Sequence, residues 1–300
     1  MPRDRFTDFL SKDELAQLTR TSNAWGWWTL AVNWALIAGA FALAIAWPNP
    51  LTIVLAVLVI AGRQLGLGII VHDCAHHALF SGRRLNEVIG QWFAAVPMMS
   101  SLPKYRTYHL KHHRFAGTPN DPDIGFVKSY PVARESLRRK FARDLSGRTG
   151  FRDQMLAFRR FRFAEQWPWL VFQAGLLAVL TLAGGWWAYV LWWVALLLVY
   201  PAIVRLRQIG EHGVATDRSS TDARLNTSTT LVRWWERLFV APNNVSYHLE
   251  HHLAAGVPPS RLRDMHRLLK SRGFYEGYSC IVAGYGDVLR RSVKAAQHIA

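Results

Sequence analysis

The sequence predicts an all-α integral membrane protein with four transmembrane helices in two hairpins and a helical cytoplasmic cap that carries a site for two metal ions. Two observations support this fold class. Hydrophobic residues make up 51% of the 300 residues, and 14 residues are Trp, a composition typical of membrane proteins. Ten of the twelve histidines fall into three short clusters and one further position. We treat the chain, residues 1–300, as a single membrane domain.

The first predicted hairpin consists of residues 25–47 and 51–71. The first stretch has 23 uncharged residues, enough for a helix to cross a hydrocarbon core of ~30 Å. The segment 48–50, Pro-Asn-Pro, then forms a turn. Arg63 interrupts the second stretch, so we expect its helix to continue beyond the bilayer towards His72. Arg63 should face the helix bundle or its aqueous end rather than lipid.

The second predicted hairpin lies within residues 167–204, which include no charged residue. A stretch of this length is too long for one span and suits two. Gly184 and Gly185, near its middle, are typical turn residues. The sequence therefore predicts spans at about 167–183 and 186–204.

The charged residues predict the orientation of these spans. Residues 63–166 carry 18 basic and 8 acidic residues, whereas both turns within the hairpins carry none. Because basic residues favour the cytoplasmic side, the termini, the long loops and every clustered histidine should be cytoplasmic. The net charge of +16 is concentrated beside membrane spans, which favours contact with anionic lipid over binding of nucleic acid.

Two segments of the cap should lie at the membrane surface. Residues 85–96 place apolar side chains at helical spacing and predict an amphipathic helix lying on the membrane rather than crossing it. Residues 134–163 interleave arginines with phenylalanines, as expected of an interfacial loop, with a solvated face as the alternative.

The clustered histidines have the spacing of metal ligands on helices. Positions i, i+3 and i+4 share one helix face, and each cluster contains such positions. A lone HxxxH is a weak signal, since solvated or core histidines also produce it. Three clusters in one chain favour metal binding. The candidate ligands are His72, His76 and His77; His109, His112 and His113; His248, His251 and His252; and His212.

The number of candidate ligands predicts two metal ions. A tetrahedral zinc takes four ligands, so nine or ten rings exceed the needs of one ion. Two ions with five or six ligands each would use about this many once oxygen or water fills the open positions. Imidazole suits zinc, copper, iron and nickel, so the residues alone leave the metal open.

These motifs resemble the integral-membrane fatty acid desaturase and hydroxylase superfamily. The resemblance covers about residues 55–270 and rests on HDCAHH, HLKHH and HLEHH, with TPNDPD after the second motif, NVSY before the third and Val257-Pro258 after it. It implies two iron ions held by these boxes, with His212 as a further ligand. His77 lies 100° around the helix from His76 and is either a ligand or a supporting residue. The family commonly has Phe-Pro where Ala254-Ala255 stands here.

The resemblance also implies a reaction. Two irons would use O2 and two external electrons to remove hydrogens from adjacent carbons of a fatty acyl or lipid substrate, giving a desaturase. The sequence has no dinucleotide fingerprint and no cysteine set for an iron–sulfur cluster, so a separate ferredoxin- or cytochrome-type donor is implied. Two alternatives stay open: a carotenoid ketolase or lipid hydroxylase on the same scaffold, and a non-catalytic metal-binding membrane protein.

Carboxylates lie among the histidines and could orient the rings, because a metal-bound His usually donates its other N–H to a carboxylate or carbonyl. We expect this role for Asp123, with a solvated or capping role as the alternative. We interpret His266 and His298, which stand outside the boxes, as ordinary surface residues. The nearby carboxylates are Asp73, Asp121, Asp123, Glu211 and Glu250.

The predicted topology can be tested with fused reporters. Reporters placed at residue 49 and at residue 185 should report a position outside the cytoplasm, and a reporter at the C-terminus a position inside it. A C-terminus outside the cytoplasm would separate the histidine boxes across the bilayer and contradict a single site.

Overall fold

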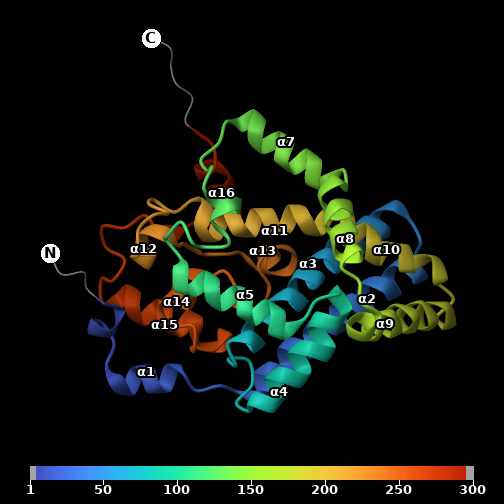
Figure 1. Ribbon diagram of the computed structural model, residues 1–300, viewed down its shortest axis with the longest axis horizontal. Coiled ribbons are helices and arrows are strands. Elements are labelled where there is room, and N and C mark those ends of the chain that lie inside the picture. Colours follow the sequence, from blue (N-terminus) through green and yellow to red (C-terminus); the bar gives the residue numbers. More distant parts are fainter. Residues whose placement is uncertain (1–4, 295–300) are drawn as a thin grey trace, which may run out of the picture.

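The computed structural model describes residues 5–294 and is mostly helical (Figure 1). The sheet content of this part of the chain is one parallel pair, β1 (Thr229–Thr230) with β2 (Ile281–Val282). The α-helices are α1 (Lys12–Leu18), α2 (Asn23–Ala46), α3 (Pro50–Ala75), α4 (Arg83–Val88), α5 (Leu102–Phe115), α6 (Ile124–Val127), α7 (Arg134–Leu145), α8 (Arg148–Arg159), α9 (Phe163–Leu182), α10 (Tyr189–Val194), α11 (Tyr200–Gln208), α12 (Ala223–Asn226), α13 (Trp234–Phe239), α14 (His248–Leu253), α15 (Pro259–Ser271) and α16 (Tyr285–Arg291).

Shorter helical turns extend or connect these helices. Three are π-helical, with a wider turn than the α-helix: η2 (Ile89–Ala95), η5 (Ala195–Val199) and η6 (Ile209–Gly213). The 3₁₀ turns are η1 (Phe6–Asp8), η3 (Val96–Met98), η4 (Trp186–Ala188) and η7 (Pro242–Asn244).

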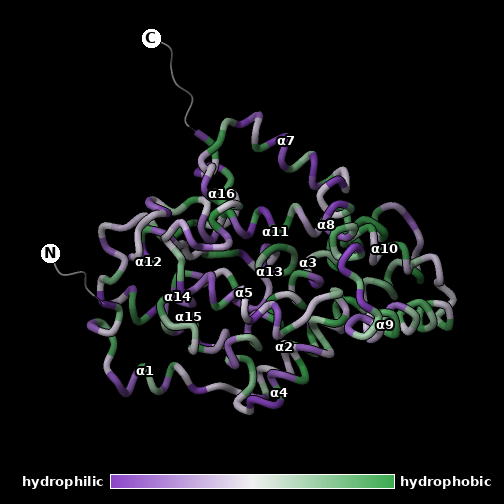
Figure 2. Tube along the Cα trace, in the orientation of Figure 1, coloured by the Kyte–Doolittle hydropathy of each residue, from purple (hydrophilic) through white to green (hydrophobic). Residues whose placement is uncertain are grey.

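Three stretches are helical, long and apolar enough to cross a membrane within the described residues: Lys12–Ala46, Pro50–Ala75 and Trp186–Gly213. They contain three of the four predicted spans. The predicted span at 167–183 forms helix α9, which does not reach that standard. The chain therefore has the helices of an integral membrane protein, and the arrangement of four spans in two hairpins stays a prediction. Figure 2 shows hydrophobic residues gathered along α9 and α10, at the end of the molecule opposite α12, α14 and α15.

Helix α3 is the central element of the fold. It begins at Pro50, where the Asn49 side chain accepts hydrogen bonds from the backbone N–H groups of Leu51 and Thr52. It packs against α2, α5, α10, α11 and α13. Its last turns carry the first histidine box, so packing that fixes α3 also positions His72.

Polar residues in the middle of α3 face protein. Arg63 is buried and donates to the carbonyl of Arg237 at 3.0 Å and to that of Leu238. These carbonyls belong to the end of α13, where helices leave acceptors unpaired. Gln64 donates to the Trp192 carbonyl at 2.9 Å. The expectation that Arg63 faces the protein interior rather than lipid is confirmed.

The segment predicted as an amphipathic helix at 85–96 is helical but changes from α4 to the π-helical turn η2 and to η3. Gly90 allows η2 to approach α3 closely, because a Cβ at this position would lie 2.6 Å from the Cβ of Cys74. Trp92 and Phe93 are about half exposed, at 48% and 49%. The outer side of this segment is therefore apolar, as an interfacial helix requires.

Helices α7 and α8 form the basic part of the cap, and a buried ion pair fixes them to the helical core. Asp144, at the end of α7, is fully buried and pairs with Arg205 of α11. Thr149 of α8 donates to the same carboxylate at 2.6 Å. Phe151 and Phe158 are exposed on α8, consistent with the interfacial position predicted for residues 134–163.

Candidate dinuclear metal centre

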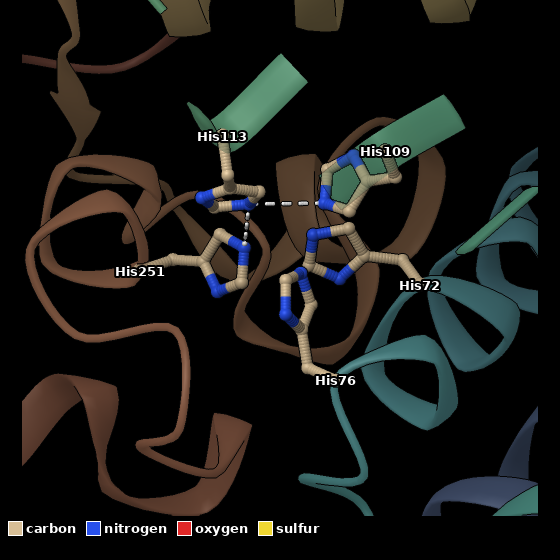
Figure 3. Close-up of side chains that lie close together, drawn as sticks. All are labelled: His72, His76, His109, His113 and His251. Atoms are coloured by element: carbon tan, nitrogen blue, oxygen red, sulfur yellow. Dashed lines mark hydrogen bonds between the residues drawn. The ribbon is translucent and has the colours of Figure 1, made fainter. Parts of the chain in front are cut away.

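Nine of the ten predicted ligands converge in two adjacent groups. The five-histidine cluster consists of His72, His76, His109, His113 and His251, and the four-histidine cluster consists of His112, His212, His248 and His252. In each cluster the candidate ligand nitrogens all lie within 4.8 Å of one another. The rings of the first cluster point towards a common centre (Figure 3). The two clusters are adjacent, because His113 of one stacks on His252 of the other with ring centroids 4.3 Å apart.

Each HxxHH box serves both clusters. On α5, His109 and His113 are four residues apart and enter the five-histidine cluster, whereas His112 enters the other. Helix α14 reverses this division: His248 and His252 belong to the four-histidine cluster and His251 to the five-histidine cluster. Residues at i and i+4 lie one above the other on a helix, which suits two ligands of one ion. The remaining histidine of each box lies to one side and belongs to the other cluster.

His212 enters the four-histidine cluster from a π-helical turn. It lies in η6, which follows α11 and widens the last turn before the chain leaves the helix. The Asn226 carbonyl lies 2.9 Å from His212 Nδ1, and His212 Nε2 lies 3.1 Å from His248 Nε2. A carbonyl can only accept, so Nδ1 carries the proton and Nε2 presents its lone pair to the cluster.

Buried carboxylates orient other rings. Asp73 lies 2.8 Å from His72 Nδ1, and Asp121 lies 2.7 Å from His112 Nδ1. The role expected for Asp123 therefore falls mainly to Asp121. Asp123 lies 3.6 Å from the same nitrogen, and its other carboxylate oxygen accepts the hydroxyl of Tyr108. The turn after α5 thus places the Asp121 side chain nearer to His112 than the Asp123 side chain.

Burial keeps most of these rings neutral, as metal ligands must be. It lowers the pKa of His113 to about 2. Burial and the neighbouring histidines hold the pKa of His251 and of His252 well below the ordinary value. His112 is an exception, since burial lowers its pKa but Asp121 and other carboxylates raise it above the ordinary value. Proton binding therefore competes weakly with a metal ion at most of these rings.

The unpaired nitrogens fit a cation. His72 Nε2 and His76 Nε2 are buried, and neither has a hydrogen-bond partner in the described part of the chain. In the four-histidine cluster, His248 Nε2 lies 3.1 Å from His212 Nε2 and 3.2 Å from His252 Nε2. One imidazole N–H can bridge only one such pair, so the rings cannot satisfy one another. A metal ion in each cluster would satisfy the converging lone pairs.

The tenth predicted ligand, His77, does not join either cluster. Helix α3 ends at Ala75, and His77 has a positive φ of 54° that turns the chain away from the helix axis. Its Nε2 instead lies 3.6 Å from the Glu87 carboxylate. The departure of the chain from the helix separates His77 from His76 and excludes it from the shared centre.

A second network behind the third box corrects the interpretation of His266 as a surface residue. His266 is buried, and its Nδ1 lies 2.7 Å from the carboxylate of Glu250. The Tyr275 hydroxyl donates to the same oxygen at 2.5 Å, and Thr229 donates to the other. Because Glu250 lies between ligands of both clusters on α14, this network fixes that helix. His298 lies outside the described residues.

The sequence around His266 contains a pattern that indicates a buried position. In residues 259–271, Leu262, Met265, His266 and Leu269 recur at i, i+3, i+4 and i+7, so His266 lies on the apolar face of an amphipathic helix. A polar residue on such a face needs a buried partner. The partners Asn226 and Arg207, in contrast, have no sequence pattern that marks them.

Cavities lie on two sides of the centre. An enclosed cavity of about 10 Å³, room for roughly one water molecule, is bounded by His72, His76, His248 and His251 together with apolar residues such as Val257. A larger cavity of about 280 Å³ is bounded by His109, His112, His212 and His248. The larger cavity offers a route by which a substrate could reach the centre.

Comparison with known proteins gives one family match and several similar enzymes. It matches the fatty acid desaturase family over residues 48–281. It is 28% identical to a dihydrorhizobitoxine desaturase of Bradyrhizobium elkanii over 299 residues, which cover 92% of this chain and 82% of that protein. It is 33% identical to a beta-carotene ketolase of Paracoccus sp. (strain PC1) over 216 residues, covering 69% and 78%. An sn-1 oleoyl-lipid 12-desaturase of Synechocystis sp. is 26% identical over 231 residues, covering 68% and 64%.

Removal of one ligand should affect the two clusters unequally. His252→Ala leaves three histidines in its cluster and should reduce the metal content from about two ions to about one per chain. His251→Ala leaves four and should retain more metal. Mass spectrometry of the metal content after dialysis against a chelator measures both. His77→Ala is the matched control and should keep about two ions. If His77→Ala lost as much metal as His252→Ala, the assignment of His252, and not His77, as a metal ligand would be contradicted.

The two aspartates can be separated by matched substitutions. Asp121→Asn should weaken metal binding by about 10- to 100-fold, because it removes the charge that orients His112. Asp123→Asn makes the same chemical change two residues away and should have a smaller effect. Chelator competition measures the affinities. An equal or larger loss in Asp123→Asn would return the orienting role to Asp123.

Proposed function

Because the chain belongs to the fatty acid desaturase family, we propose that it is an O2-dependent di-iron desaturase that introduces a double bond into the acyl chain of a fatty acid or membrane lipid. The observation that carries the proposal is the division of nine histidines into two clusters that share the boxes on α5 and α14. Such an all-nitrogen centre with room for two ions suits redox chemistry with O2 better than it suits a structural metal.

The reaction needs a metal because a C–H bond in a saturated chain has no acidic proton for a side-chain base to remove. Bound iron would supply the reduction of O2 on which hydrogen removal depends. The balance is –CH2–CH2– plus O2, two electrons and two protons, giving –CH=CH– and two molecules of water. The proposed ligands are His72, His76, His109, His113 and His251 for one ion and His112, His212, His248 and His252 for the other.

The protein's own contribution is to fix the ligands and to restrict access. Asp73, Asp121 and the Asn226 carbonyl hold three rings in one tautomer and orientation. Helix α3, which carries His72 and is followed directly by His76, is fixed by packing against α2, α5, α10, α11 and α13. The larger cavity, which the histidines of both clusters line, offers an approach to the centre for a substrate.

The two electrons must come from a separate donor of the ferredoxin or cytochrome type. The two cysteines, Cys74 and Cys280, are both buried and free, so they offer no iron–sulfur site. Helix α15 packs against α14 and exposes Arg261, Arg263 and Arg267. This basic surface lies one helix from the metal ligands and supports docking of an acidic donor at the cytoplasmic side.

Oxygenation is the second candidate, favoured by the similarity to a beta-carotene ketolase at 33% identity. Oxygenation and desaturation begin with the same hydrogen removal and differ in the fate of the carbon centre, so the shared ligands do not separate them. The tyrosines and arginine of the larger cavity do not resemble a site for a long, wholly apolar carotenoid. A metal transporter is disfavoured, because the ligands of a transporter should lie on broken helices at mid-bilayer. The clustered histidines of this chain are instead predicted to lie on one aqueous side of the membrane.

Product analysis tests the proposal. A host that expresses the chain should accumulate substrate molecules lighter by two hydrogens, about 2 mass units, in a reaction that requires O2 and a reductant. His248→Ala should abolish the product, because it removes a ligand, whereas His77→Ala should retain it. Mass spectrometry of extracted acyl compounds measures the products. Products heavier by one oxygen would transfer the assignment to the hydroxylases and ketolases.

A further inference from the structure

The larger cavity beside the metal centre has a polar wall. Apart from the histidines, the wall includes the polar residues Tyr105, Tyr108, Arg207 and Gln208 and the carboxylates Asp123 and Glu211, and only Phe126 and Val127 have purely apolar side chains. Its volume of about 280 Å³ is near the lower limit for small-molecule sites. An unbranched hydrocarbon would leave these polar groups without partners, at a cost for each. The wall therefore suits a polar part of the substrate.

Arg207 is the positive group in this wall and is only partly paired. Its Nε donates to Glu211 at 2.5 Å, and its side chain is 16% exposed. Within residues 5–294, no hydrogen-bond acceptor contacts its two terminal nitrogens. A guanidinium presents those nitrogens as a fork that matches a carboxylate. A mostly buried guanidinium with a free fork, beside a cavity, is the arrangement expected of an anion-binding residue.

The position of Arg207 limits which carbons of a substrate reach the metals. Glu211, its partner, lies 3.4 Å from His248 Nδ1. One carboxylate and one imidazole therefore separate the guanidinium from the metal position at His248. A substrate anion on Arg207 would place carbons close to that anion, not the middle of a long chain, beside the metal ligands.

A second cleft provides space for the rest of such a substrate. It has a volume of about 680 Å³ and shares Tyr105 and Tyr108 with the cavity of about 280 Å³ beside the metal centre. Its wall includes Val96 of η3, Met99 directly after η3, and Trp169 of α9. An apolar tail could extend along this wall towards the apolar helix α9 while the anion stays inside.

We propose that Arg207 binds the carboxylate of the substrate, so that an aliphatic acid enters with its carboxylate first and is desaturated near that end. This inference rests on the proposed desaturase function. The balanced change is R–CH2–CH2–COO⁻ plus O2, two donor electrons and two protons, giving R–CH=CH–COO⁻ or its neighbouring isomer and two molecules of water. The substrate class is then a free carboxylate with an adjacent saturated chain, not a neutral glycerolipid desaturated at mid-chain.

The experiment compares binding of octanoate and octanamide to the metal-loaded protein in detergent by isothermal titration calorimetry. These probes differ in charge at the terminal group and little in size. The wild-type protein should bind octanoate at least tenfold more tightly. Arg207→Gln should reduce octanoate binding at least tenfold and leave octanamide binding within about twofold. The matched control is Lys111→Gln, which removes one exposed positive charge from α5 without altering either cavity, and it should bind octanoate as the wild type does.

Two results would overturn the proposal: equal binding of both probes by the wild-type protein, or an equal effect of Lys111→Gln and Arg207→Gln. Because Arg207 also contacts Glu211, the metal content of Arg207→Gln is measured alongside. If the metal content falls, the comparison of octanoate with octanamide in the wild-type protein tests the proposal. Products of octanoate then locate the double bond, and desaturation only at mid-chain of phosphatidylcholine would also overturn it. Oxygenated products would overturn the proposed desaturation but leave the binding result intact.

Discussion

The structure depends on one electrostatic constraint: nine imidazole nitrogens converge in a buried space and cannot satisfy one another. Burial opposes protonation of these rings, as the depressed pKa values of His113, His251 and His252 indicate. A positively charged ion is the partner that relieves both problems. The helices that supply the rings are otherwise held by apolar packing and buried polar contacts, so the site is formed by the fold and completed by the metal.

The surrounding carboxylates follow from the same constraint. Asp73, Asp121, Glu211 and Glu250 are all buried, an expensive arrangement unless positive charge lies nearby. Metal ions held by the neutral rings would supply that charge. The carboxylates in turn hold ring N–H groups, directly at His72 and His112. Ligand orientation and charge compensation are therefore performed by the same residues.

The sequence could predict which histidines meet but not how they divide. Spacing at i and i+4 predicts that His109 and His113 face one centre, and the two rings lie in the same cluster. The assignment of His112 to the other centre depends on how α5 and α14 face each other, which no local pattern contains. The amphipathic pattern of α15 indicates that His266 is buried, but its partner Glu250 lies on a different helix and no local pattern identifies it. His77 directly follows His76 in sequence but lies past the end of the helix. There the backbone conformation, not helical spacing, determines where the side chain points.

The metal ligands do not determine the reaction outcome in this family. The chain resembles a desaturase and a ketolase at similar identity, 28% and 33%. The residues that distinguish one reaction from another must then lie around the ligands. There they determine which carbon of the substrate approaches the centre and what happens to that carbon after hydrogen is removed. In this chain those residues are Tyr105, Tyr108 and Gln208, together with Arg207. The polarity that they give to the cavity favours a substrate with a polar group beside the centre, because an apolar chain would leave these side chains without partners.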